Sequence, residues 1–342
     1  MKKSEVIFNR SAFLDEFKGS EALLHEAENI GKEFAGKNYE RLFLTGCGAP
    51  HYLMRVLAFW ANRAAVSTDI RTFHSASLVQ QNPSALDDKT LVLLGSHSGT
   101  TKETVEAAQF IDQNPAFTVA ITRDPESPLA KASDLVLAYA DEKQGYFSSY
   151  ILAQALVSAF LEGMEKKWTY HEKIMQALPS LPAALADAKA AGMPKSEMIA
   201  EKIKDENVLY VIGAGPMFTT AYVFASCFLM EMQHIQAYAI DAADFFHGPF
   251  EAMDEQTPLI LLMGEDPCRQ QAERVLDFCK RFSKNFYVYD SKEFEMAGIP
   301  GKIRPLVSPF IVDAAMTNLV EKLAILRGHP MTLRRYMGKV DY

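Results

Sequence analysis

The stretch Arg41-Leu-Phe-Leu-Thr-Gly-Cys-Gly-Ala-Pro50 begins with a short apolar run and ends in a turn rich in glycine. An apolar helical pattern follows over residues 52–60. An apolar run without polar alternation is typical of a strand that is buried on both faces of a parallel sheet. The stretch therefore predicts a strand, a glycine turn and a helix, which is the beginning of an α/β unit.

The same design returns 167 residues later as Val208-Leu-Tyr-Val-Ile-Gly-Ala-Gly-Pro216, followed by an apolar helical pattern over residues 220–230. Two further pairs of apolar runs keep nearly the same offset, with helical patterns between them. Three matches in the same order indicate an internal repeat. We therefore predict an α/β fold of two tandem domains, each a parallel sheet flanked by helices on both faces. The further pairs are 91–95 with 259–264 and 117–122 with 286–290, and the helical patterns are 101–111 and 270–282.

The length of 342 residues also favours two domains, because single hydrophobic cores stop growing at roughly 250–300 residues. Between the repeats the chain lacks strand signals and contains Leu-Pro-Ser-Leu-Pro at 178–182 and Gly-Met-Pro at 192–194, which predicts helices broken by prolines. We predict an N-terminal helical segment at 1–38, a first domain at 39–162, a helical linker at 163–206, a second domain at 207–328 and a C-terminal tail at 329–342.

Composition excludes several classes of protein. With 49% hydrophobic and 23% charged residues the chain resembles ordinary globular proteins. A net charge of −8 offers no basic patch for nucleic acid. The chain contains no run of 18 uncharged apolar residues, so no membrane span is predicted. The first residues lack the apolar core of a signal peptide. We therefore expect a cytoplasmic protein with no nucleic-acid or membrane partner.

The cysteines are scattered and form no C-x-x-C pair, so neither a zinc site nor a redox pair is indicated. A disulfide framework is not expected in a chain of this size. We expect no metal and no organic cofactor. The cysteines are Cys47, Cys227, Cys268 and Cys279.

A loop of small polar residues, Gly95-Ser-His-Ser-Gly-Thr-Thr-Lys-Glu-Thr104, joins a predicted strand to a predicted helix. The start of a helix presents free backbone N–H groups, and hydroxyl groups there can bind phosphate oxygens. The loop lacks the lysine of a Walker A motif and the G-x-G-x-x-G spacing, which disfavours nucleotides. Ser96, Ser98 and Thr101 are thus candidate phosphate ligands, although Ser98 or Thr101 could simply cap the helix. His97 is by itself a structural or rim residue.

Two residues of the second repeat can carry acid–base chemistry. Glu231 interrupts an apolar helical pattern, so its carboxylate must be paired, exposed at the helix end or held with a raised pKa. His247 precedes Gly-Pro sixteen residues later, after a strand-like run at 236–240. An exposed glutamate and a structural histidine are the alternatives. If both lie at one edge of the sheet, they form a general acid–base pair.

Together these motifs resemble the sugar isomerase (SIS) superfamily, in the double-domain arrangement of the isomerase portion of glucosamine-6-phosphate synthase. The resemblance extends from about residue 41 to residue 342 and rests on Ser-x-Ser-Gly-x-Thr-x-Glu-Thr at 96–104 and on Glu231 with His-Gly-Pro at 247–249. Within the superfamily, Met-Glu-Met-Gln at 230–233, Phe-Phe-His-Gly-Pro-Phe-Glu at 245–251 and the tail are similar to fructosamine-6-phosphate deglycases.

The resemblance implies phosphate contacts by the loop, with His97 contributing its backbone. It implies catalytic roles for Glu231 and His247. The tail residue Lys339 is implied as a substrate contact. The turn that contains Gly48 belongs to the implied substrate site, but Ala49 and Pro50 stand where the family often has hydroxyl residues. Asp244 stands where a glutamate is usual. The implied phosphate and substrate ligands are Gly48, Ser96, His97, Ser98, Thr101 and Lys339.

The activity that this resemblance implies is hydrolytic deglycation of a 6-phosphorylated amino sugar, such as fructoselysine 6-phosphate, to a hexose phosphate and an amino acid. A ketose–aldose phosphate isomerase is the first alternative, and a non-catalytic sugar-phosphate sensor is the second. Apolar helical surface at 52–60 and 151–161 exceeds what one sheet face needs. It predicts a homodimer or a higher homo-oligomer.

Overall fold

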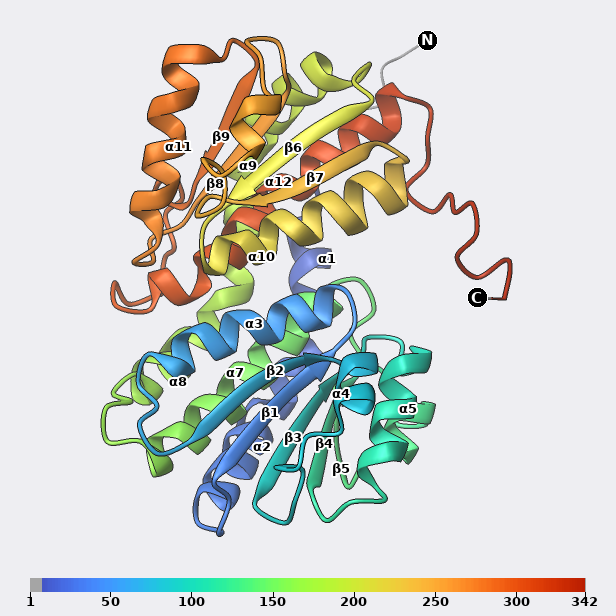
Figure 1. Cartoon of the computed structure of the whole chain (residues 1–342), viewed down its shortest axis with the longest axis vertical. Coiled ribbons are helices and arrows are strands. Elements are labelled where there is room, and N and C mark those ends of the chain that lie inside the picture. Colours follow the sequence, from blue (N-terminus) through green and yellow to red (C-terminus); the bar gives the residue numbers. More distant parts are fainter. Residues whose placement is uncertain (1–7, 342) are drawn as a thin grey trace. The chain divides into compact units, whose positions relative to one another are not determined.

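The computed structural model describes residues 8–341, so the part of the predicted N-terminal helical segment at 1–7 lies outside the described residues. The chain divides into two compact units (Figure 1). The first unit comprises residues 10–182, and the second comprises residues 183–341 together with Phe8 and Asn9. Each unit contains one parallel sheet with helices on both faces, which confirms the predicted fold class.

The first unit holds a five-stranded sheet in the order β2-β1-β3-β4-β5, and every neighbouring pair is parallel. Because β1 pairs with β2 on one side and with β3 on the other, the direction of winding reverses between β1 and β3. Ligands of open α/β sheets bind at the carboxyl ends of the strands at such a reversal. The strands are β1 (Arg41–Gly46), β2 (Asp69–His74), β3 (Thr90–Gly95), β4 (Phe117–Thr122) and β5 (Leu135–Ala138).

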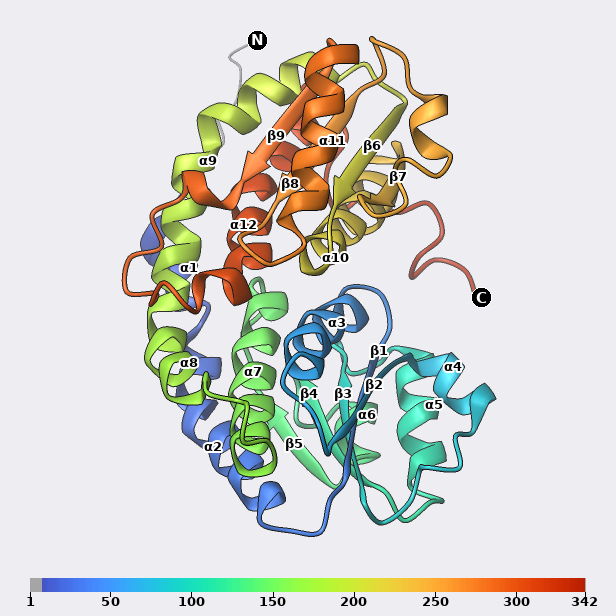
Figure 2. The same cartoon turned by 60° about the vertical axis from the view of Figure 1, so that its left-hand side comes forward.

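Helices cover both faces of this sheet (Figure 2). One face carries α2 (Lys18–Ala35), α3 (Ala49–Asn62) and α7 (Gly145–Met164), which pack on one another. The other carries α4 (Ser75–Gln81), α5 (Lys102–Ile111) and α6 (Pro128–Lys131). By length and composition α7 could cross a membrane, but 83% of its most apolar window is buried within the protein, as in the core helix of a globular domain. The remaining helices are α1 (Arg10–Asp15), α8 (His171–Ala177) and η1 (Leu178–Ser180).

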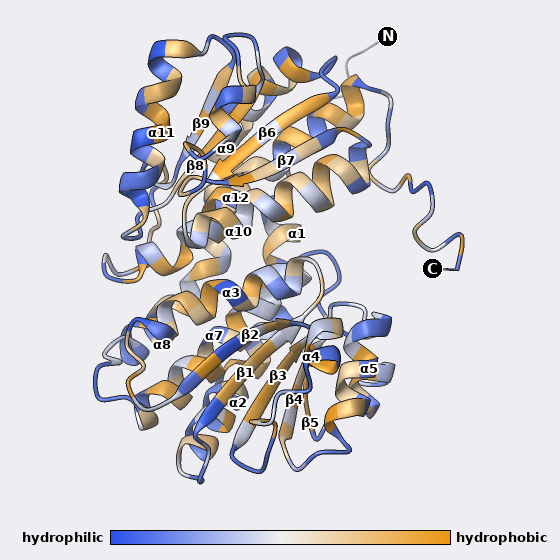
Figure 3. Ribbon diagram, in the orientation of Figure 1, coloured by the Kyte–Doolittle hydropathy of each residue, from blue (hydrophilic) through white to orange (hydrophobic). Residues whose placement is uncertain are grey.

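The second unit holds a four-stranded parallel sheet in the order β7-β6-β8-β9, with the same reversal, here between β6 and β8. Hydrophobic residues run along β6, whereas α11 alternates hydrophobic and hydrophilic residues (Figure 3). The strands are β6 (Val208–Gly213), β7 (Gln236–Asp241), β8 (Leu259–Met263) and β9 (Phe286–Asp290). The helices are α9 (Leu181–Ile203), which begins two residues before the unit, α10 (Pro216–Val223), η2 (Phe224–Met232), η3 (Pro249–Ala252), α11 (Arg269–Phe282), η4 (Ser291–Glu293) and α12 (Arg304–Leu326).

Three details differ from the sequence expectations. Strands β2 and β5 were not predicted, because β2 mixes polar and apolar residues and β5 has only four residues. The apolar helix expected at 220–230 is divided into α10 and the nine-residue π-helix η2. Pro194 lies inside the 23-residue helix α9, so this proline does not break the helix.

Candidate functional site

The carboxyl ends of β1 and β3 bring two turns together in the first unit. Gly46 and Gly95 end the two strands as register partners. The next turn contains Gly48, whose φ of 59° favours glycine and which directly precedes α3. A Cβ atom added at Gly48 would meet nothing within 4 Å. The turn after β1 is therefore open at the point where a ligand of this sheet is expected.

The loop Ser96–Thr101 follows β3 and is held by its own hydroxyl groups. Ser96 is buried, its Oγ lies 2.9 Å from Thr101 Oγ1, and it accepts a hydrogen bond of 3.2 Å from the Gly99 N–H. Ser98 Oγ accepts hydrogen bonds from the Thr100 N–H and hydroxyl, at 3.2 and 3.0 Å. The structure thus brings all three predicted hydroxyl ligands into one short loop.

The capping alternative can be tested at the start of α5. Thr101 occupies the N-cap position, but its side chain makes no capping hydrogen bond and contacts Ser96 instead. Within residues 8–341 no hydrogen bond is recorded for the N–H groups of Ser98 or Lys102. A helix start whose N–H groups lack a side-chain cap is suited to an anion. The geometry favours an anion site over simple capping.

The His97 side chain turns away from the hydroxyl groups of the loop. Its Nδ1 lies 2.8 Å from Tyr139 Oη, which also accepts a hydrogen bond from Ser149. Burial and the nearby Arg123 lower the pKa of His97, and burial raises the pKa of Tyr139 to about 12, so both side chains are neutral at pH 7. Only the backbone of His97 remains available to the loop.

A cavity of about 220 Å³ adjoins this loop inside the first unit. It is lined by the start of α3, by Gly95 and His97, and by residues 142–149 at the start of α7. Nothing in the composition of residues 142–149 marks them as part of a site, so they were not predicted from the sequence. Ala49 and Pro50, the departures from the family pattern, add apolar surface to the cavity.

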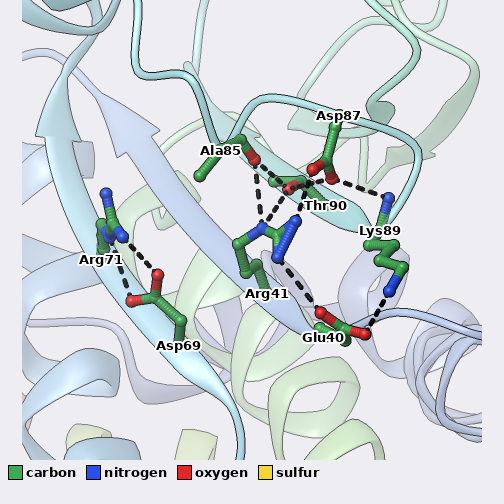
Figure 4. A network of polar contacts seen from close by, with 8 residues as sticks. All are labelled: Glu40, Arg41, Asp69, Arg71, Ala85, Asp87, Lys89 and Thr90. Carbon is green, nitrogen blue, oxygen red and sulfur yellow. Dashed lines mark hydrogen bonds and ion pairs between the residues drawn. The ribbon is translucent and has the colours of Figure 1, made fainter.

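The opposite, amino edge of the first sheet is occupied by ion pairs (Figure 4). Arg41 pairs with Asp87 at 2.5 Å, Arg71 pairs with Asp69, and Lys89 pairs with Glu40. These cations are engaged in holding the starts of the strands. They are not ligands for an anion at the carboxyl edge.

In the second unit Glu231 lies near the end of η2. A π-helix is rare and often marks a functional site. The Glu231 side chain is 26% exposed, and its Oε1 lies 2.7 Å from Arg334 Nη2 in the tail. Of the options open for this glutamate, the structure shows a carboxylate that is paired. No sequence pattern indicated its partner, which lies about a hundred residues further along the chain.

His247 lies in the turn after β7. Its ring is exposed and has no recorded partner among residues 8–341, while its backbone N–H donates to Asp244. The neighbouring Phe245 is fully buried and anchors the turn. Glycine at 248, with a φ of 132°, directs the chain into η3.

Within a single chain Glu231 and His247 do not share one edge of the sheet, so the condition for an acid–base pair is not met there. Glu231 precedes β7 and His247 follows it. Ile235, just before β7, donates to the Leu229 carbonyl, which ties the end of η2 to the amino end of the strand. A six-residue strand spans roughly 17 Å. The two side chains therefore lie at opposite edges of the second sheet.

Lys339 lies in the tail, where its Nζ donates to the carbonyl of Arg334. Tyr336, Met337 and Val340, apolar residues of the same tail, are about half exposed or more. The contact with Glu231 is made by Arg334 rather than by Lys339. Among the described residues no cluster of three or more histidine, cysteine or acidic side chains could hold a metal ion.

Comparison with known proteins adds an independent line of evidence. Residues 37–163 match the family model described as SIS domain. Fructosamine deglycase FrlB of Bacillus subtilis is 33% identical over 319 residues, which cover 93% of this chain and 97% of that protein. The chain belongs to the SIS domain family. The predicted resemblance is thereby confirmed.

Other relatives of this SIS protein agree. Fructoselysine 6-phosphate deglycase of Escherichia coli is 25% identical over 311 residues, covering 90% of this chain and 88% of the relative. A crystal structure of a candidate phosphosugar isomerase from Bacillus subtilis is 31% identical, with a TM-score of 0.86 over 97% of this chain and 100% of that one. The fold and the family thus rest on both sequence and structure.

Proposed function

We propose that this chain is an enzyme that hydrolyses a 6-phosphorylated fructosamine to a hexose 6-phosphate and a free amino acid. The observation that carries the proposal is the loop Ser96–Thr101, with an uncapped helix start beside the open turn at Gly48. This arrangement suits a phosphorylated sugar. The relatives named as deglycases support the same reaction.

The phosphate group is assigned to the loop, through Ser96, Ser98, Thr101 and the backbone of His97. Gly48 contributes an open turn without a side chain. Hydroxyl and N–H donors bind a phosphate without placing a full positive charge beside it. The role of the first unit is to select a phosphorylated substrate.

The acid–base step is assigned to the second unit. His247 assists opening of the sugar ring. Glu231 then takes a proton from C1 of the ketosamine and delivers one to C2, while O2 gains a proton and the amine nitrogen loses one. The C2 carbonyl thereby becomes a hydroxyl and the C1–N bond becomes an imine. Water adds to the imine carbon, and the C–N bond breaks to release the amine and leave an aldose phosphate. Proton transfer by a positioned side chain contributes about 10²–10⁴-fold.

We further propose a cytoplasmic homodimer in which the catalytic pair is completed between two copies. The positions of Glu231 and His247 at opposite edges of one sheet support this. A second copy can supply the missing group in a symmetric assembly. In an equal mixture of exchanging Glu231→Gln and His247→Asn chains, activity should recover to roughly a quarter of the wild-type value. A mixture as inactive as its two components contradicts shared sites.

The test of the function is release of sugar phosphate and amine from a panel of 6-phosphorylated glycated amino acids. We expect equal amounts of hexose 6-phosphate and amino acid, and no turnover of the unphosphorylated sugars. Interconversion of ketose and aldose phosphates without amine release would identify an isomerase instead. Binding without any conversion would identify a sensor.

A further inference from the structure

The C-terminal tail is anchored to the end of the helix that carries Glu231. Gln233 is buried, and its Nε2 donates to the His329 carbonyl at 3.1 Å. The rings of His234 and His329 meet edge to face with centroids 4.5 Å apart. The beginning of the tail is thus fixed two residues from the proposed acid–base group.

Further along the tail, Arg334 is itself held in place. Its Nη1 donates to the carbonyl of Met331 at 2.7 Å and to that of Leu333 at 3.2 Å. Its own carbonyl accepts from Lys339. Only 20% of the side chain is exposed. The guanidinium is therefore oriented by its own segment before it meets a partner.

A second nitrogen of that guanidinium contacts Glu231. Arg334 Nη2 lies 2.7 Å from Glu231 Oε1, whereas no partner is recorded for Glu231 Oε2 within residues 8–341. An ion pair near the protein surface contributes only about 0–1 kcal/mol to stability. Here 20% of the Arg334 side chain and 26% of the Glu231 side chain are exposed, and Glu231 lies in a π-helix. Stability alone does not account for the arrangement.

Both side chains face an open groove of about 580 Å³. Glu231 is the only acidic residue of its lining, and the other charged side chains are cations of the tail. Burial lowers the pKa of His234, and His329 and the nearby cations Arg335, Arg334 and Lys339 lower it further. The lining residues are Met230, Glu231, His234, Ile235, Gln236, Arg334, Arg335, Tyr336 and Met337.

We propose that Arg334 is a positioning residue for Glu231. By binding Oε1 it fixes the carboxylate and leaves Oε2 as the atom that accepts the proton from the substrate. Small errors in the placement of a reacting group can cost on the order of 10²-fold in rate. This inference rests on the proposed function, and the role it gives to Arg334 differs from the substrate contact that the resemblance implies for Lys339.

The test compares Arg334→Ala with Arg334→Lys and with the surface control Arg281→Ala on α11. We expect Arg334→Ala to lower kcat by at least about tenfold with KM changed by less than about twofold. Arg334→Lys, which can still donate to Oε1, should recover most of the loss. The control should match the wild type. Equal melting temperatures of all four proteins would show that folding is unaffected.

Two outcomes overturn the proposal. An unchanged kcat in Arg334→Ala means that Glu231 needs no partner. A raised KM with unchanged kcat means that Arg334 binds the substrate itself. Exchange of the C1 protons of fructose 6-phosphate with solvent deuterium, followed by NMR, separates this inference from the proposed function. Exchange needs Glu231 but no amine release, so a loss of exchange in Arg334→Ala supports positioning even if no deglycase substrate is found.

Discussion

The two repeats of this chain differ in one corresponding loop, which joins β3 to α5 in the first repeat and β8 to α11 in the second. In the first, the strand β3 ends at Gly95 and is followed by six residues rich in hydroxyl groups before α5. In the second, β8 is followed by Gly264 and then by only four residues, Glu265–Asp266–Pro267–Cys268, before α11. The first loop offers donors to a ligand, whereas the second contains two carboxylates.

In the second repeat, side chains of the β8–α11 loop occupy the space next to Gly215 and Gly264. Asp266 is buried, lies against Gly264 and accepts a hydrogen bond of 2.8 Å from the Cys268 N–H. A Cβ atom at Gly215 would lie 2.5 Å from Cys268 Sγ, although the equivalent place at Gly48 is open. Glu265 is bound by Arg304. An internal carboxylate thus occupies, in the second repeat, the place that is open at Gly48 in the first.

The proposed function places substrate binding in the first repeat and proton transfer in the second, and its largest test concerns Glu231. Glu231→Gln should lower kcat by about 10²–10⁴-fold, because an amide cannot accept the proton. Substrate affinity, measured by calorimetry, should stay near that of the wild type. Near-normal turnover in this variant, with Glu255→Gln as the control, would remove Glu231 from the chemistry.

The reverse pattern is expected in the first repeat. Ser98→Ala and Thr101→Ala should each weaken binding of the phosphorylated substrate by on the order of 1–3 kcal/mol, because each removes a hydrogen bond to a charged group. The loss should appear in KM rather than in kcat. Ser133→Ala, outside the loop, is the matched control. Equal binding of the unphosphorylated sugar by the wild type would contradict the role of the loop.

A smaller effect is expected from the tail of the second repeat. Deletion of residues 334–342 should leave a folded protein whose turnover falls at least tenfold, or about 1.4 kcal/mol of transition-state stabilisation. The measurement is kcat/KM on the best substrate of the panel, with circular dichroism as the folding control. Full activity of the truncated chain would make the tail a solvated extension.

The smallest effect is expected on stability, at Asp266 in the loop of the second repeat. Burial raises the pKa of Asp266, so the folded state disfavours the charged carboxylate. The free energy of unfolding therefore falls as the pH rises from the pKa of the unfolded state to the higher pKa of the folded state. Asp266→Asn removes that penalty and should gain stability relative to the wild type at pH 7 but not at pH 3. Thermal unfolding at both pH values measures it. Substrate affinity should not change, and weaker binding would place a ligand at that loop.

Much of the fold was predictable because buried parallel strands are nearly continuous apolar runs. The repeat offset located β1, β3 and β4 and their counterparts β6, β8 and β9. The edge strand β2 escaped because its outward residues are polar, as in Asp69-Ile-Arg-Thr-Phe-His74. Pro194 was expected to break a helix, but it lies inside α9, because a proline in a long helix is tolerated when the surrounding packing holds the helix.

Only part of the site was predictable, because sequence patterns show which residues are neighbours along the chain and not which distant segments meet. The loop at 96–101 is contiguous, so its hydroxyl groups are close wherever the loop lies. The pairing of Glu231 with Arg334 joins distant segments, and no local pattern encodes it. The position of His247 was open to sequence reasoning, since residues before and after one strand must lie at opposite edges of the sheet.

The π-helix η2 bears on how the two repeats diverged. After β1 the helix is α3, a regular α-helix of 14 residues, whereas after β6 the chain runs for 17 residues through α10 and η2. Each residue inserted into a helix turns all later side chains by about 100° around the axis. The π-helical turns of η2 therefore give position 231 a direction that a regular α-helix would not give it, while β6 still pairs with β7 and β8.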